Sequence, residues 1–213
     1  MMTASRPSGG TRSRGEDIVM KSLLAALVVF PATARAQQWT TEQTIAAGVL
    51  PLPEVLRAGA GVRRMTSEGP VVLRQSSNRM MCTVNETAVK QFDVRCYSTA
   101  FLNVMDYARG LMRQGIVDSA LDTRLKLDHQ AGKITIPDYP TAGYRMLGPR
   151  SAFDVRSNRA GDEIKKWQSV HFPFRTAAEL GLPTEQEGTM PFVMESGTWW
   201  SHVMIVHQSE PLP

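Results

Sequence analysis

Apolar residues recur at helical spacing through residues 101–112 and mark the clearest element of the chain. Their spacing of three and four positions places the side chains on one face of an α-helix. Asn103, Asp106 and Arg113 fall on the other side, and Ser98 is a suitable cap for the helix start. The pattern therefore predicts a helix that packs on a core. Its apolar positions are Phe101, Val104, Met105, Ala108, Leu111 and Met112.

Two further segments carry the signals of helix starts. A second long helix is expected to begin at a cap formed by Asp118 or Ser119, with Leu121 and Leu125 on its apolar face. Near the start of the globular part, Thr40–Gln43 has the Ser/Thr-x-x-Glu/Gln form of a capping box. This motif predicts a short helix directly after Thr40.

Strands are predicted where short apolar runs are separated by turn residues. Two such runs flank Ser67–Pro70, a sequence typical of a hairpin turn. A second pair flanks Asn85–Thr87, so we expect an antiparallel meander of about four strands. The polar stretch Arg156–Asp162 is expected to be a solvated loop. Later segments of strand-like composition are Ile134–Ile136, Tyr144–Leu147, Trp167–Phe172 and Ser201–His207.

The order of these elements indicates the fold class. Strands, then helices, then strands, without strict alternation, favour an α+β fold over a parallel sheet with crossover helices. We expect a mostly antiparallel sheet with two main helices packed on one face. Residues 37–213 contain no internal repeat and no low-complexity linker, and they suffice for a single globular domain with a core.

Residues Met20–Ala36 have the three parts of a secretory signal peptide. Lys21 supplies a positive charge, and Ser22–Phe30 forms a short apolar run. Ala34 and Ala36 supply the small side chains that precede a cleavage site. Because the run is much shorter than the roughly 20 apolar residues of a membrane helix, no transmembrane anchor is expected after cleavage.

The signal predicts an export segment over residues 1–36 and a mature chain beginning at Gln37 in a periplasmic or secreted location. Residues 1–19 either precede the true start at Met20 or form a long charged front region. The whole chain has 24 Lys and Arg against 20 Asp and Glu, but five basic and two acidic residues lie before Gln37. The mature chain is then nearly neutral. Since nucleic-acid binding needs clustered basic groups, it is not expected here.

The chain has two cysteines, Cys82 and Cys96. They lie in the two strand-like runs on either side of Asn85–Thr87, in a chain expected to reach a compartment that permits disulfides. A Cys82–Cys96 disulfide is therefore predicted, with a stabilisation of about 3 kcal/mol. Two thiols without a neighbouring histidine do not complete a zinc site, so no metal and no cofactor is expected.

Several segments together resemble a group of bacterial exported proteins of unknown function. The chain differs from that group at Ser98, where members often have histidine, and at Trp199, where they tend to have proline. The resemblance implies export and the fold, and it adds no chemistry. The segments are Leu56–Ala60, the Cys82 to Cys96–Tyr97 pair, the helix with Met105 and Arg109–Leu111, and Gly197–Met204.

The candidate binding residues are His171, Trp199 and His202. Alternation along Gly197–His207 should turn some aromatic or polar groups away from the core, where they could line a ligand pocket. His202 and His207 would point to opposite faces of a regular strand, so they cannot chelate one metal. The methionines are dispersed and fit core packing better than copper binding.

Two classes of function remain. The first is an exported module that binds a small ligand or an envelope partner. The second is an envelope hydrolase that draws acid or base groups from His171, Glu195 and His202. The chain has no Gly-x-Ser-x-Gly, His-Glu-x-x-His or phosphate-binding loop motif, and this favours the binding module.

Overall fold

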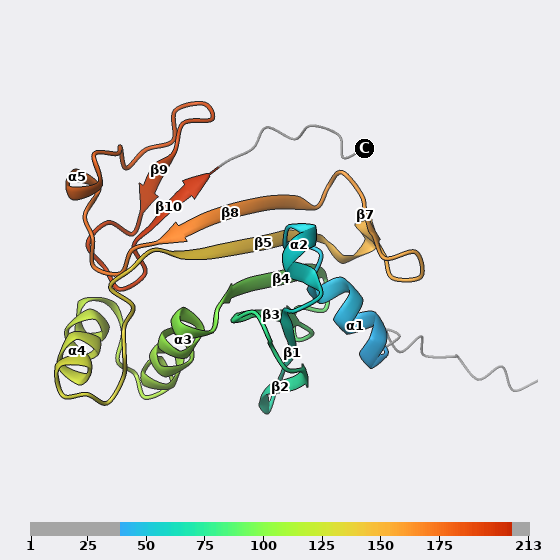
Figure 1. Ribbon diagram of the computed structural model, residues 1–213, viewed down its shortest axis with the longest axis horizontal. Coiled ribbons are helices and arrows are strands. Elements are labelled where there is room, and N and C mark those ends of the chain that lie inside the picture. The colour runs from blue at the N-terminus through green and yellow to red at the C-terminus, as the bar shows by residue number, and fades with distance from the viewer. Residues whose placement is uncertain (1–38, 206–213) are drawn as a thin grey trace, which may run out of the picture. The chain divides into compact units, whose positions relative to one another are not determined.

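An eight-stranded sheet is the centre of the computed structural model, which describes residues 39–205 (Figure 1). The strands are β1 (Gly61–Thr66), β2 (Gly69–Arg74), β3 (Met80–Asn85), β4 (Gln91–Ser98), β5 (Thr141–Pro149), β8 (Lys165–His171), β9 (Phe192–Met194) and β10 (His202–Ile205). Their order across the sheet is β2-β1-β3-β4-β5-β8-β10-β9. Neighbours are antiparallel except β1 and β3, which are parallel. The predicted export segment and His207 lie outside the described residues.

Helices cover both faces of this sheet. They are α1 (Thr41–Gly48), α2 (Glu54–Arg57), α3 (Thr99–Met112), α4 (Asp118–Gln130) and α5 (Ala177–Leu180). A short 3₁₀ turn, η1 (Arg150–Ala152), and a small hairpin of β6 (Phe153–Asp154) and β7 (Arg159–Ala160) follow β5. The fold is α+β with a mostly antiparallel sheet, which confirms the predicted class.

The two faces belong to different cores, because successive residues of a strand point to opposite sides. Cys82 packs with Ala47 of α1 in one core, whereas its neighbour Met81 packs with Phe101 of α3 in another. Leu125 of α4 lies in a cluster with residues of α3, and Figure 1 shows these two helices beside each other. The two long helices therefore share one face, as expected, and α1 covers the other.

Local signals at helix starts were correct in two of three places. Thr40 and Gln43 form the capping box of α1, with the Gln43 amide donating to Thr40 Oγ1 at 3.2 Å. Ser98 Oγ accepts a hydrogen bond from the first turn of α3. The predicted cap of α4 was wrong. Val117 is its N-cap and supplies no side-chain hydrogen bond, while Asp118 has a φ of 51°.

The predicted meander was also wrong. β1 lies between β2 and β3, so the chain crosses over after its first hairpin and adds β3 parallel to β1. Ile134 and Ile136 form no strand because they pack on the α3–α4 cluster instead. The expected loop 156–162 contains β7. The short elements α5 and β9 were not anticipated, although Thr176–Glu179 is a capping box that signals the start of α5.

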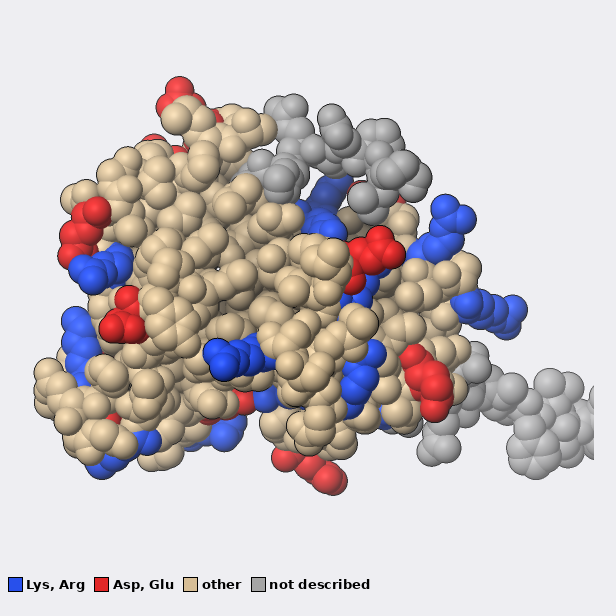
Figure 2. All heavy atoms as spheres, in the orientation of Figure 1, with Lys and Arg blue, Asp and Glu red and all other residues tan. Residues whose placement is uncertain are grey.

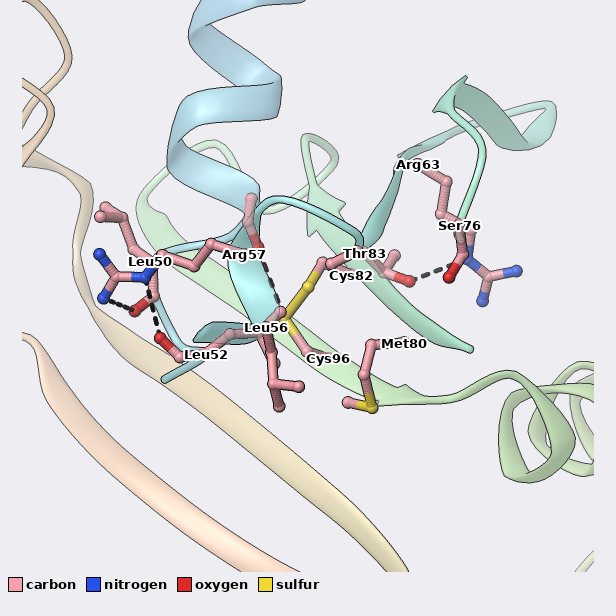
Figure 3. The surroundings of a disulfide bond; sticks show 12 residues. Leu50, Leu52, Leu56, Arg57, Arg63, Ser76, Met80, Cys82, Thr83 and Cys96 are labelled. Atoms are coloured by element: carbon pink, nitrogen blue, oxygen red, sulfur yellow. Dashed lines mark hydrogen bonds between the residues drawn. A yellow bond between two sulfur atoms is a disulfide. The ribbon is translucent and has the colours of Figure 1, made fainter. Parts of the chain in front are cut away.

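The predicted Cys82–Cys96 disulfide is present, and its residues lie directly opposite each other on β3 and β4. Their Cα atoms are 3.9 Å apart. Figure 3 shows the bond beneath the α1–α2 segment, surrounded by leucines. Gly48 lets the end of α1 lie close to β1, since a Cβ there would lie 2.8 Å from Val62 Cγ1. The disulfide therefore joins two central strands where α1 meets the sheet.

Charged side chains of both signs are interspersed on the face drawn in Figure 2, and no broad patch of one sign appears there. A surface that binds nucleic acid through its phosphates would gather basic groups.

Candidate functional site

The sheet brings two of the three candidate binding residues together. His171 on β8 and His202 on β10 are opposite each other, and their ring centroids are 4.9 Å apart. Thr141 on β5 and Met194 on β9 extend this row across four strands. The histidines are only 1% and 6% exposed, respectively, so both lie in the core and neither is a surface group.

These histidines belong to an aromatic cluster that also contains Tyr97, Phe101 and Trp200. The His171 ring centroid lies 4.3 Å from that of Phe101 and 4.9 Å from that of Trp200. Each such aromatic pair typically adds about 0.5–1.5 kcal/mol beyond its buried area. The aromatic cluster therefore holds α3, β4 and β8 to the segment before β10.

Gly143 on β5 provides the space for this packing. It lies opposite Tyr97 on β4 and Ser169 on β8. A Cβ at this position would come within 2.5 Å of Ser169 Oγ and 2.9 Å of His171 Nε2. A glycine is needed here because the neighbouring side chains occupy the volume of any larger residue.

Burial keeps both histidines neutral. The pKa of His171 falls to about 3, chiefly through burial and further through the nearby His202. His171 Nε2 lies 3.1 Å from Ser169 Oγ, whereas its Nδ1 is buried without a hydrogen-bond partner in residues 39–205.

His202 is fixed by the backbone. Its Nδ1 donates to the Trp200 carbonyl oxygen at 2.6 Å, so Nδ1 carries the proton. Burial lowers the pKa of His202 too, although this hydrogen bond and Glu195 oppose the shift. Neither histidine forms a hydrogen bond to a carboxylate within the described part of the chain.

A cavity of about 600 Å³ lies beside the aromatic cluster, and Trp200 contributes to both. Ligand pockets typically measure roughly 300–1,000 Å³. We call it the Trp199 cavity. Its walls come from β4, α3, the first turns of α4 and residues 195–200. The lining residues are Arg95, Met105, Arg109, Met112, Asp118, Ser119, Leu121, Asp122, Glu195, Thr198, Trp199 and Trp200.

Hydrogen bonds hold the tryptophan wall in place. The Trp199 amide donates to Asp122 Oδ1 of α4 at 2.7 Å, and Thr198 Oγ1 donates to the Glu195 carbonyl oxygen at 2.8 Å. Glu195 has a φ of 56° and Asp118 a φ of 51°, both in the left-handed region. Such conformations persist only where the surrounding structure holds them, and they concentrate at ligand-binding sites.

A second cavity of about 310 Å³ adjoins the first, and Arg95, Met105 and Arg109 line both. We call it the arginine cavity. It lies over the α3 face of β1, β3 and β4. Asp93 and Tyr97 are also among its lining residues.

Asp93 anchors two guanidinium groups of this region. Arg95 donates to both carboxylate oxygens, at 3.0 and 2.8 Å, and Arg145 Nε donates to Oδ1 at 3.1 Å. Burial alone would raise the pKa of Asp93, but the two arginines outweigh it and lower that pKa. Asp93 therefore stays ionised and fixes both arginines.

The Trp199 cavity contains one of the three candidate binding residues and two arginines that the sequence did not indicate. Trp199 lines the Trp199 cavity, as does Glu195, whereas His171 and His202 do not. The missed residues are Arg95 and Arg109. Asp93 and Arg95 are two apart in a strand and thus share a face, which could have indicated a buried ion pair. No sequence signal placed Arg109 beside them, because only the packing of α3 on β4 does so.

Comparisons with protein-family models, with curated proteins and with solved structures find no match. Among residues 39–205, no three His, Cys, Asp or Glu side chains are grouped so that they could hold a metal ion. In the same part of the chain no helix has the length and apolar character to cross a membrane. The function is therefore inferred from the geometry of the two cavities.

Proposed function

We propose that this protein is an exported binding module whose organic ligand occupies the Trp199 cavity. The observation that carries the proposal is the composition of the cavity wall. Trp199, Trp200, Met105 and Met112 supply apolar surface, and five charged side chains lie beside them. Pockets that are mainly apolar, with a small number of fixed polar groups, are typical of small-ligand sites.

The alternative, an envelope hydrolase, has less support. Its acid or base groups would be His171, Glu195 and His202, but the histidines are buried in the aromatic cluster. Burial lowers the pKa of His171 to about 3, so it is a weak base at neutral pH. Glu195 lines the cavity without them. Glu195 influences the pKa of His202, but in residues 39–205 it forms no hydrogen bond to either histidine, and this favours binding over acid–base catalysis.

Export is supported by the signal-like segment Met20–Ala36 and by the disulfide, since disulfides persist in oxidising compartments. We expect the mature protein to begin at Gln37 when it is recovered from outside the cytoplasm. N-terminal sequencing of the secreted or periplasmic material is the measurement. A folded cytoplasmic species that retains Met20 would contradict this proposal.

Replacing Trp199 by alanine should weaken binding in the cavity. We expect the neutral fluorescent probe N-phenyl-1-naphthylamine to bind the wild type and to bind Trp199→Ala roughly tenfold more weakly, because tryptophan side chains are common binding hot spots. Fluorescence titration measures both affinities. Trp167→Ala is the matched control, since Trp167 is half-buried and does not line this cavity.

Two outcomes would contradict the proposal. One is failure of the wild type to bind the probe, and the other is an affinity of Trp199→Ala equal to that of the wild type. Circular dichroism and thermal unfolding of each variant separate loss of binding from loss of fold. His202→Ala is unsuitable for this test, because His202 is buried and its truncation would destabilise the core.

A further inference from the structure

Arg95 and Arg109 occupy the boundary between the two cavities. Both line the Trp199 cavity and both line the arginine cavity. The acidic residues of the Trp199 cavity, Asp118, Asp122 and Glu195, come from α4 and the 195–200 segment and do not line the arginine cavity. A ligand that reaches from the Trp199 cavity into the arginine cavity therefore meets Arg95 and Arg109 at the boundary and leaves these three acidic groups behind.

Carboxylates hold these guanidinium groups without using all their donors. Asp93 accepts from Nε and Nη2 of Arg95, and Asp106 accepts from Nη1 of Arg109 at 3.0 Å. Within residues 39–205, Nη1 of Arg95 and Nη2 of Arg109 have no hydrogen-bond partner in the protein. An arginine fixed in this way can donate to a ligand at little further cost in conformational entropy.

The ion pairs around the arginine cavity contain more positive than negative groups. Asp106 pairs with both Arg63 and Arg109, and Asp93 pairs with both Arg95 and Arg145. Each carboxylate thus neutralises only one of its two partners. Arg95 and Arg109 are about one-third exposed, at 33% and 31% of their side chains, so a ligand can reach them.

Hydroxyl groups line the arginine cavity together with the guanidinium groups. Tyr97 and Thr83 line the arginine cavity. Burial raises the pKa of Tyr97 despite the nearby arginines, so its phenol stays neutral and remains a hydrogen-bond donor. Guanidinium and hydroxyl donors around a net positive charge are complementary to an oxoanion, and charge-assisted hydrogen bonds are the strong ones.

We infer that Arg95 and Arg109 bind the oxoanion of a ligand whose apolar body lies against Trp199 and Trp200. The oxoanion is a carboxylate, sulfonate or phosphate group. This inference rests on the proposed function, because it places the apolar part of the ligand in the Trp199 cavity. The inference adds that the ligand carries a negative charge and that Arg95 and Arg109 select for that charge.

Two dyes of nearly the same shape test the inference. N-phenyl-1-naphthylamine is neutral, and 8-anilino-1-naphthalenesulfonate adds one sulfonate to the same aromatic body. We expect the sulfonate dye to bind the wild type roughly tenfold more tightly, the effect of one charged hydrogen-bonded contact. Added salt should weaken the binding of the sulfonate dye and leave the binding of the neutral dye unaffected.

Arg109→Gln and Arg95→Gln should each remove most of this preference, measured as the ratio of the two dye affinities in the same variant. Arg109→Gln is the safer variant, because Asp106 keeps its pairing with Arg63. In Arg95→Gln, Asp93 keeps only its ion pair with Arg145, so the fold of this variant must be checked by circular dichroism. Arg113→Gln is the matched control, since Arg113 is an exposed arginine after the same helix and lines neither cavity.

The outcomes separate the two proposals. Equal binding of both dyes by the wild type, or a preference that Arg109→Gln leaves intact, would overturn the oxoanion inference and leave the cavity as a binding site. Failure of both dyes to bind would overturn the proposed function itself. A preference that disappears in the Arg113→Gln control as well would assign it to general surface charge and overturn the inference.

Discussion

Acidification from pH 7 to pH 5 is expected to lower the free energy of unfolding by about 2 kcal/mol through His171 alone. In the folded protein burial lowers the pKa of His171 from 6.5 to about 3. Between these values the unfolded chain binds a proton that the folded chain does not. Stability is therefore fully present above about pH 6.5 and is lost as the pH falls towards 3.

The measurement is urea unfolding at a series of pH values in the wild type and in His171→Phe. Between pH 7 and pH 5 the unfolding free energy of the variant should fall by about 2 kcal/mol less than that of the wild type, because the variant lacks the His171 contribution. The pH range above 5 precedes most of the carboxylate titration, since the ordinary pKa of aspartate is 3.8. His129→Gln is the control, because it removes an exposed histidine that lies outside the aromatic cluster. Identical pH dependence in the wild type and His171→Phe would show that His171 is not the group responsible.

Reduction of the Cys82–Cys96 disulfide should destabilise the protein by about 3 kcal/mol. The bond closes a loop with a sequence separation of 14 and restricts the unfolded chain. Both cysteines are fully buried between the sheet and the α1–α2 segment. We therefore expect the oxidised protein to resist reductant until it unfolds.

Urea unfolding of the oxidised and the reduced wild type measures this effect without changing any side chain. Alkylation followed by mass analysis confirms the redox state of each sample. Cys82→Ala with Cys96→Ala should be less stable than the reduced wild type, because it also loses packing in the core beneath α1. Equal unfolding free energies for the oxidised and reduced wild type would contradict the prediction.

Sequence reasoning succeeded where the signals are local. The helix that begins after Ser98 was predicted from its apolar spacing and its cap, both of which depend on neighbouring residues. The disulfide was predicted from the even cysteine count, the compartment that the signal segment indicates and the two strand-like runs joined by a short polar link. Pairing of β3 with β4 then places the two cysteines opposite each other.

Sequence reasoning failed for contacts between residues that belong to separate elements. His202 looked like a surface group near Trp199, yet β10 pairs with β8 inside the sheet and places it against His171. Trp199 reaches its cavity because its amide binds Asp122, a residue 77 positions earlier in the chain. Neither contact has a sequence signal, since each depends on which strands and helices become neighbours.

The sequence by itself determined the α+β class, the long helices, several strands and the partner of each cysteine. These features follow from periodicity, caps and turns, whose physical causes act over a few residues. Only the tertiary structure decided the parallel pairing of β1 with β3 and the burial of the two histidines. It alone also brought Arg95 and Arg109 beside the tryptophans, because long-range packing selects one of many arrangements that the same local elements permit.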